Sequence, residues 1–259
     1  MSAIGYSDVE LAEHLAETAG KLLLAVRDSG VFTGNALGQA GDQTANQFLV
    51  HALRAQRPDD GLLSEEMTCD GSRLGRTRVW IIDPVDGTRE YGEGRSDWAV
   101  HVGLAIDGVA TVGAVALPGL GLTLSSHSPH DLGPAADPPR MVISRSRPAS
   151  EVVAVAEALG ATLVPMGSAG AKAMAIVRGE AEIYLHAGGQ YEWDSCAPAA
   201  VARAAGLHVS RADGAPLRYN SDDTYLPDLL ICRPELAERV LALFKASDVG
   251  NGLLEIDQT

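Results

Sequence analysis

The ten residues Val79–Thr88 constrain this chain more than any other stretch, because they begin as an apolar strand and end as Asp-Pro-Val-Asp-Gly-Thr. The strand is expected to deliver Asp83 to its end, and Pro84 cannot continue a strand ladder, so we predict a turn there. In a tight turn the carboxylates of Asp83 and Asp86 and the carbonyl of Val85 can face one point. Oxygen clusters of this kind bind hard cations such as Mg²⁺.

Gly87 and Thr88 extend the same motif. Glycine lets the backbone come close to a ligand, and the free N–H groups of a helix beginning after Thr88 would favour a phosphate. Asp-Pro and Asp-Gly are also ordinary turn pairs. Their combination within six residues, directly after an apolar strand, favours a functional site over a plain turn.

Three further acidic positions are candidates for the same site. Glu65 and Glu66 follow a short apolar run, although adjacent glutamates are common on surfaces. Asp194 precedes an Ala-rich helical stretch, where an Asp is most often an N-cap. Asp42 stands at the predicted start of a helix over 42–55, where its simplest role is again a cap. Its functional reading pairs it with the Thr88 hydroxyl, so that the two take a proton from an attacking water.

Composition and charge exclude several classes of protein. The formal net charge is −14, and no dense basic run offers a surface for nucleic acid. No apolar stretch approaches the ~18 residues of a membrane span, and no signal peptide is recognised near Met1. Three widely spaced cysteines suit neither a disulfide framework nor a metal-ligand pair, so we expect a cytoplasmic protein.

The order of predicted elements favours an α/β protein with two lobes. Helices are expected over 7–29 and 42–55, with Ser7 and Glu10 as a capping box, and a strand-rich middle predicts an antiparallel or mixed sheet. The Pro-, Asp- and Gly-rich stretch 129–139 is the expected boundary. We therefore divide the chain into residues 1–130, an N-terminal lobe of helices and mixed sheet with most metal ligands, and residues 140–259, an α/β lobe with Asp194.

Taken in order, these motifs resemble the lithium-sensitive inositol monophosphatase superfamily, over about residues 42–220. The markers are Glu65-Glu66, the Asp-Pro-Xaa-Asp-Gly-Thr motif of residues 83–88, and Trp193-Asp194. The resemblance implies a layered αβαβα sandwich and Mg²⁺-dependent catalysis inhibited by Li⁺. By position it implies metal ligation by the side chains or carbonyls of Glu65, Asp83, Val85, Asp86 and Asp194. It implies catalytic roles for Asp42, Thr88 and Glu65.

Within that superfamily, Arg89-Glu90-Tyr91 resembles the Lys-Glu-Phe of the 3′(2′),5′-bisphosphate nucleotidases. The Ser144-Arg145-Ser146 segment and Glu192, before Trp193, are similar to that branch as well. The implied reaction is removal of the 3′-phosphate from adenosine 3′,5′-bisphosphate, as part of sulfate assimilation. The sulfated form of this nucleotide is a second implied substrate. Residues 36–41 differ from the Ser-Pro-Val-Thr usual there, and residues 167–172 have the spacing of the inositol phosphatases.

The implied substrate contacts come from both lobes: Asp86, Gly87, Thr88, Arg89, Ser144, Arg145, Ser168, Lys172 and Asp194. The expected partner is a small phosphorylated molecule, and a homodimer is expected. The alternatives are an inositol monophosphatase or broad-range sugar phosphatase, and a catalytically silent metal or nucleotide sensor. A dinucleotide-binding dehydrogenase is disfavoured because no Gly-Xaa-Gly-Xaa-Xaa-Gly follows an early strand.

Overall fold

The structure, a computed structural model, describes residues 5–68, 71–127 and 131–256, with side chains up to residue 247. Its strands form two five-stranded sheets. In the first sheet the order is β1-β2-β3-β4-β5, with bounds Gly61–Ser64, Arg78–Asp86, Ala99–Ile106, Val109–Leu117 and Leu122–Ser125. In the second the order is β7-β6-β8-β10-β9. The strands β6 to β10 span Arg140–Ser144, Thr162–Met166, Ile183–Tyr191, His208–Ser210 and Tyr225–Cys232.

Both sheets are mixed. In the first sheet β1 and β2 run parallel, and the other neighbours are antiparallel. In the second, β6 is parallel to β7 and β8, whereas β8, β10 and β9 are antiparallel. The mixed sheet predicted for the strand-rich middle is therefore confirmed.

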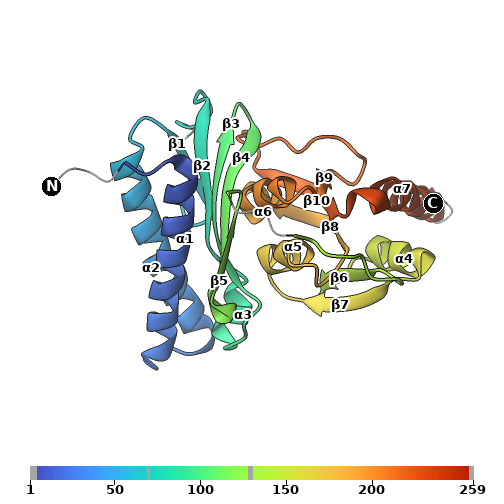
Figure 1. The fold of residues 1–259 in the computed structure, drawn as a ribbon, viewed down its shortest axis with the longest axis horizontal. Helices are drawn as coiled ribbons and strands as arrows, with labels where there is room; N and C mark the ends of the chain where they lie inside the picture. The colour runs from blue at the N-terminus through green and yellow to red at the C-terminus, as the bar shows by residue number, and fades with distance from the viewer. Residues whose placement is uncertain (1–4, 69–70, 128–130, 257–259) are drawn as a thin grey trace.

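The helices complete a sandwich of five layers (Figure 1). Their bounds are α1 Asp8–Asp28, α2 Gly34–Gln56, α3 Thr88–Gly92, α4 Ser150–Leu159, α5 Ala169–Val177, α6 Glu192–Ala204 and α7 Pro234–Ile256, with a 3₁₀ turn, η1, at Pro118–Leu120. One apolar core lies between the first sheet and α1 and α2, and a second lies between the two sheets with α5 and α6. A third packs α4 and α7 on the second sheet. The αβαβα expectation is confirmed.

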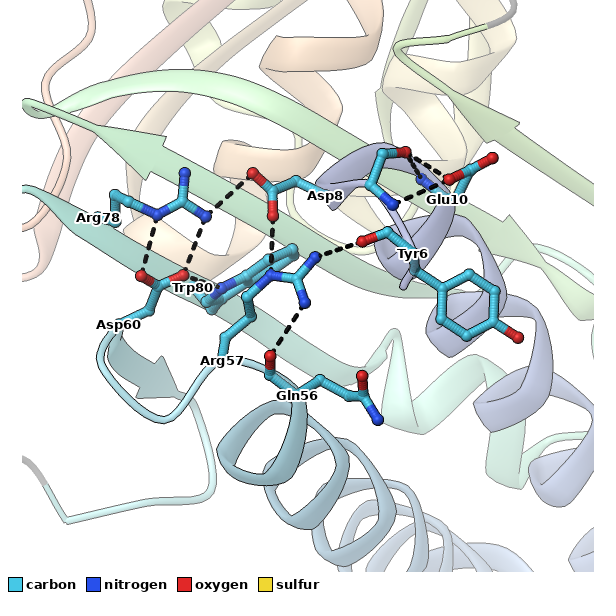
Figure 2. Close-up of polar contacts among 9 residues, drawn as sticks. Tyr6, Asp8, Glu10, Gln56, Arg57, Asp60, Arg78 and Trp80 are labelled. Atoms are coloured by element: carbon cyan, nitrogen blue, oxygen red, sulfur yellow. Dashed lines mark hydrogen bonds and ion pairs between the residues drawn. The ribbon is translucent and has the colours of Figure 1, made fainter. Parts of the chain in front are cut away.

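The N-terminal helix follows its sequence pattern closely. Ser7 caps α1, with its hydroxyl accepting from the Glu10 backbone and the Glu10 carboxylate accepting from the Ser7 backbone. A polar cluster then ties this end of α1 to the first sheet (Figure 2). The carboxylate of Asp8 accepts from Arg57 and Arg78 at 2.9 and 3.0 Å. Arg78 also donates to Asp60, which accepts from the indole of Trp80.

The second helix begins eight residues earlier than predicted. Gly38 and Gly41 precede the helix predicted over 42–55, but both lie inside α2. A Cβ at Gly38 would come within 2.6 Å of the Thr88 methyl, and one at Gly41 within 2.7 Å of the Tyr91 ring. The glycines therefore serve close packing of α2 on α3 rather than a chain break. Asp42 consequently lies inside the helix, and its reading as a cap is wrong.

The turn predicted at Pro84 is also wrong. Strand β2 continues to Asp86, and its register against β3 shifts between Asp83 and Asp86. An irregularity of this kind lets a strand keep its direction while a ladder bond is lost, which suits a proline without an N–H.

The proposed lobe boundary at 129–139 begins inside residues 128–130, which lie outside the described residues, as does Cys69. The two sheets fall on either side of this segment. The division into residues 1–130 and 140–259 stays a prediction. In the described part of the chain no helix is both long and apolar enough to cross a membrane.

Candidate metal and phosphate site

Three carboxylates from two distant segments converge between the sheets. Asp83 and Asp86 come from the end of β2, and Asp194 from the first turn of α6. One oxygen of each lies within 4.8 Å of the others, so the three can share a cation. Asp194 is not the N-cap, because α6 begins at Glu192 and Tyr191 holds the cap position. The Asp194 carboxylate instead accepts from the Tyr191 backbone N–H at 2.6 Å.

The electrostatics of this cluster favour a bound cation. Burial raises the pKa of Asp83 well above its usual range, and the charges of Glu65 and Asp86 add to the effect. Burial and the charge of Asp86 raise the pKa of Asp194 to about 6. Burial, and then the charge of Asp194, raise the pKa of Glu65 to about 7. Crowded carboxylates of this kind are stabilised when a cation becomes the largest local charge.

Asp86 behaves differently because both His101 and the start of α5 contact its carboxylate. Burial alone would raise its pKa, but the charge of His101 and several hydrogen bonds lower it to about 2. The Ser168 hydroxyl donates to Oδ2 at 2.5 Å, and so does the backbone N–H of Gly170 at the start of α5. The Ala169 N–H donates to Oδ1 at 3.1 Å. His101 and helix α5 thereby hold a carboxylate of the first sheet in its ionised form.

His101 is a site residue that sequence reasoning missed. It is fully buried, with Nε2 3.1 Å from Asp86 Oδ2. Gly170 permits this approach, because a Cβ there would collide with His101 Nε2. The pairing of β2 with β3 sets its position, because His101 lies opposite Asp83, and this long-range register is not evident from the sequence.

Asp42 and Thr88 lie together beside this cluster. The Thr88 hydroxyl is 3.0 Å from the Val85 carbonyl and 3.4 Å from Asp42 Oδ2. Burial and the charge of Glu66 raise the pKa of Asp42 to about 7. Glu65 also lies near, since Glu65 and Asp83 each influence the pKa of the other. The structure therefore brings together the residues expected to bind metal and those expected to move a proton.

A pocket of about 420 Å³ opens from Asp86 and Asp194. The predicted substrate contacts all line it: Asp86, Gly87, Thr88, Arg89, Ser144, Arg145, Ser168, Lys172 and Asp194. Several are already occupied by internal partners. Arg145 donates to Glu90 and Glu93, and the buried Lys172 donates to the carbonyls of Gly167 and Ser168. Arg147 lines the same pocket, and in the described part of the chain no acidic partner is recorded for it.

A second set of contacts joins the two regions that carry Glu65 and Asp194. Arg73, only 2% exposed, follows Glu65 in the connection from β1 to β2 and donates to Asn220 Oδ1 and the Ser221 carbonyl. The backbone N–H groups of Asn220 and Ser221 donate to the buried carboxylate of Glu192, at 2.7 and 2.8 Å. Glu192 is the first residue of α6. These contacts link the two segments. We call the four residues that make them the β1–α6 clamp: Arg73, Glu192, Asn220 and Ser221.

Comparison with known proteins places this arrangement in a family. A model described as the inositol monophosphatase family matches residues 8–131 and 140–248. The 3′-phosphoadenosine 5′-phosphate phosphatase of Mycobacterium leprae is 46% identical over 254 residues, covering 92% of this chain and 94% of the relative. The protein of the same name from Mycobacterium bovis is 50% identical over 234 residues, covering 86% and 88%.

More distant relatives agree. The 3′(2′),5′-bisphosphate nucleotidase CysQ of Escherichia coli strain K12 is 29% identical over 230 residues, covering 82% of this chain and 94% of the relative. Among solved structures, CysQ from Bacteroides thetaiotaomicron superposes with a TM-score of 0.76 at 24% identity, over 89% of this chain and 98% of the other. That likeness shows a shared fold.

Proposed function

This chain belongs to the inositol monophosphatase family, and we propose that it is a phosphomonoesterase that removes the 3′-phosphate of 3′-phosphoadenosine 5′-phosphate, also called adenosine 3′,5′-bisphosphate. Relatives 46% and 50% identical, matched over most of both chains, carry the name of that phosphatase. The product of the reaction is AMP. The observation in this chain that carries the proposal is the convergence of Asp83, Asp86 and Asp194, of which Asp86 and Asp194 line the pocket.

The donor set fits Mg²⁺. Every candidate ligand offers oxygen, and burial together with neighbouring carboxylates raises the pKa values of Asp83 and Asp194. We propose that Glu65, Asp83, Asp86 and Asp194 and the carbonyl of Val85 hold the ion. When bound, Mg²⁺ polarises the phosphoryl oxygens and lowers the pKa of the attacking water.

Asp42 and Thr88 would receive the proton of that water. A pKa near 7 suits a general base that works at neutral pH. The Thr88 hydroxyl has one proton, and donating it to Asp42 leaves a lone pair that can accept the proton of the water. The 3.4 Å separation permits this once the pair tightens around substrate. Glu65, which lies near Asp83, would orient the same water.

A basic side chain is needed for the second phosphate of the substrate. Arg145 already binds two glutamates, and Lys172 is buried on backbone carbonyls. We assign the 5′-phosphate to Arg147, whose guanidinium has a geometry suited to bidentate phosphate contacts. Ser144, Arg89 and the backbone around Gly87 line the same pocket and complete the polar wall.

The proposal also covers inhibition by Li⁺, a homodimer, and a cytoplasmic reaction that serves sulfate assimilation. These extensions rest on the family resemblance of the motifs, and each has a direct assay: phosphate release with millimolar Li⁺, light scattering, and fractionation of the source cells.

Phosphate release from purified protein tests the central proposal. The substrates are adenosine 3′,5′-bisphosphate, its sulfated form, inositol 1-phosphate and a sugar bisphosphate, each with Mg²⁺ and after EDTA treatment. We expect the highest kcat/KM for adenosine 3′,5′-bisphosphate and no turnover without metal. A higher kcat/KM for inositol 1-phosphate or the sugar bisphosphate would identify the protein as an inositol monophosphatase or a broad-range sugar phosphatase instead. Binding without turnover on every substrate would identify a silent sensor.

A further inference from the structure

One wall of the pocket carries buried polar atoms without partners. Gln190 on β8 is 7% exposed, and within the described residues neither its Oε1 nor its Nε2 has a hydrogen-bond partner. The hydroxyl of Tyr184, 1% exposed, is unpartnered in the same way. Both residues line the pocket with Asp86 and Asp194. Buried amides are nearly always hydrogen-bonded, because leaving them unpaired is costly, so these groups point to a ligand.

The local backbone explains how Gln190 comes to face the pocket. Gly188 and Gly189 have φ values of +98° and +90°, and the register of β8 against β10 shifts beside them. The Gly189 carbonyl lies 2.9 Å from Nε2 of His186, which fixes the irregularity. Strand irregularities re-aim the side chains that follow them and occur beside active sites.

Tyr191, the next residue, presents an open aromatic face to the same pocket. One face of its ring stacks on Trp193, with centroids 4.8 Å apart and planes 12° apart. Tyr225 meets the ring edge-on at 6.1 Å. Tyr191 remains 47% exposed and lines the pocket, so its second face is free for a planar ligand. The backbone N–H of Tyr191 donates to the carboxylate of Asp194, so Tyr191 directly contacts a proposed metal ligand.

We propose that Gln190 and Tyr191 form the subsite for the adenine ring of the substrate, an inference that rests on the proposed function. An amide offers one donor and one acceptor, which match the exocyclic amine of adenine and its neighbouring ring nitrogen. The open face of Tyr191 stacks on the purine. Inositol phosphate has no flat ring and no such edge. These two side chains therefore supply selectivity for the nucleotide. The metal site does not supply it, because it binds the phosphate group that all phosphomonoesters share.

Steady-state kinetics of two variants on two substrates test the subsite. Tyr191→Ala is expected to lower kcat/KM for adenosine 3′,5′-bisphosphate by roughly 10- to 100-fold, mainly through a higher KM. Stacking on one base contributes about 1–3 kcal/mol, and about 1.4 kcal/mol corresponds to a tenfold change. Gln190→Leu is expected to cost about tenfold. On inositol 1-phosphate both variants should stay within about threefold of wild type. Phe32→Ala and Gln56→Leu, exposed positions outside the pocket, are the matched controls.

A substrate analogue gives a second readout that needs no variant. Purine riboside 3′,5′-bisphosphate lacks the exocyclic amine, so the wild-type protein should hydrolyse it with about tenfold lower kcat/KM, and Gln190→Leu should treat the two nucleotides alike. Equal kcat/KM of the wild type on both nucleotides would overturn the role of Gln190. An equal loss on nucleotide and inositol phosphate in Tyr191→Ala, or no loss on either, would overturn the role of Tyr191.

These outcomes differ from a failure of the proposed function. If the wild-type protein itself prefers inositol 1-phosphate, the function is wrong. If the wild type prefers the nucleotide and both variants keep the wild-type ratio of kcat/KM between the two substrates, the function stands and only the subsite is wrong.

Discussion

Nε2 of His101 lies 3.1 Å from Oδ2 of Asp86, inside the protein, while Nδ1 lies 3.0 Å from the Trp193 carbonyl. The first is an ion-pair distance without hydrogen-bond geometry, whereas the second is a hydrogen bond to a backbone carbonyl. Burial alone would lower the pKa of His101, but the charge of Asp86 raises it. A protonated His101 would place a positive charge beside the acidic cluster, and its ring contacts the segment that carries Asp194.

Replacing His101 by Gln should make the protein depend more on metal for stability. Glutamine carries no charge, so it cannot place a cation beside the carboxylates, and the Trp193 carbonyl loses its bond from Nδ1. We expect the metal-free variant to lose about 1–3 kcal/mol of unfolding free energy, the usual cost of leaving a buried polar group without its partner. Saturating Mg²⁺ should raise Tm more in the variant than in wild type. Equal Mg²⁺-induced shifts would contradict the electrostatic role.

Replacing Asp83 by Asn should have the opposite effect on the metal-free protein. The amide Oδ1 can still accept from the Val85 N–H, as Asp83 Oδ1 does at 3.0 Å, while one repelling charge is removed. We expect Tm without metal to be unchanged or raised, the Mg²⁺-induced rise to disappear, and turnover to be nearly abolished. Asp28→Asn, at an exposed position, is the control for the change of side chain. A variant with near-wild-type turnover would show that Asp83 does not bind the metal.

The sequence was sufficient for the layered fold and for grouping the acidic residues, because the order of its motifs resembles that of a known family. Apolar periodicity located the helices and strands, and the Asp-Pro-Val-Asp-Gly-Thr motif stands at a strand end in the structure as predicted. The errors arose where tertiary packing overrides a local preference. Gly38 and Gly41 are poor helix formers, yet α2 runs through them since only glycine allows the approach of Thr88 and Tyr91.

Residues that act through long-range contacts were beyond sequence reasoning. Nothing local to His101 indicates Asp86, and nothing near Arg73 indicates Asn220, 147 positions later. A binding role for Gln190 and Tyr191 likewise could not be inferred from the sequence, because an unpaired amide is recognised only when its burial is known. Glu192 was noted for its resemblance to one branch, but its bonds to two backbone N–H groups required the structure.

The pair of Asp42 and Thr88 should control kcat rather than substrate binding. Asp42→Asn removes the proton acceptor while keeping the shape of the side chain, and we expect kcat to fall by about 10²–10⁴, the usual size of a general-base contribution. Thr88→Val should give a loss in the same direction. Thr44→Val on the same helix, whose hydroxyl bonds only to the Ala40 carbonyl, is the control. A change confined to KM would mean that the pair only positions substrate.

The β1–α6 clamp should set metal affinity. In Glu192→Gln the amide NH₂ faces one of the two backbone N–H groups of Asn220 and Ser221, so one hydrogen bond is lost. We expect unfolding free energy to fall by about 1–3 kcal/mol, and the half-saturating Mg²⁺ concentration to rise, since Glu65 and Asp194 are less firmly fixed relative to each other. At saturating Mg²⁺, kcat should largely recover. Glu180→Gln, which is half exposed, is the control. A stability loss without any change in Mg²⁺ dependence would leave the clamp a purely structural feature.

Asp8 should contribute to acid stability through the cluster in Figure 2. Partial burial alone would raise its pKa, but hydrogen bonds from Arg57 and Arg78 lower it below the ordinary 3.8. A carboxyl with a lowered folded-state pKa stabilises the protein above its unfolded pKa, and this contribution is lost as pH falls through the folded value. Because solvent screens these ion pairs, we expect Asp8→Asn to cost about 1 kcal/mol at pH 7. Chemical denaturation from pH 7 to pH 3 should show the gap between wild type and variant closing as pH falls below about 4. The exposed Asp28→Asn should give no such convergence, and a gap for Asp8→Asn that is constant with pH would mean that packing, not charge, is what the variant lost.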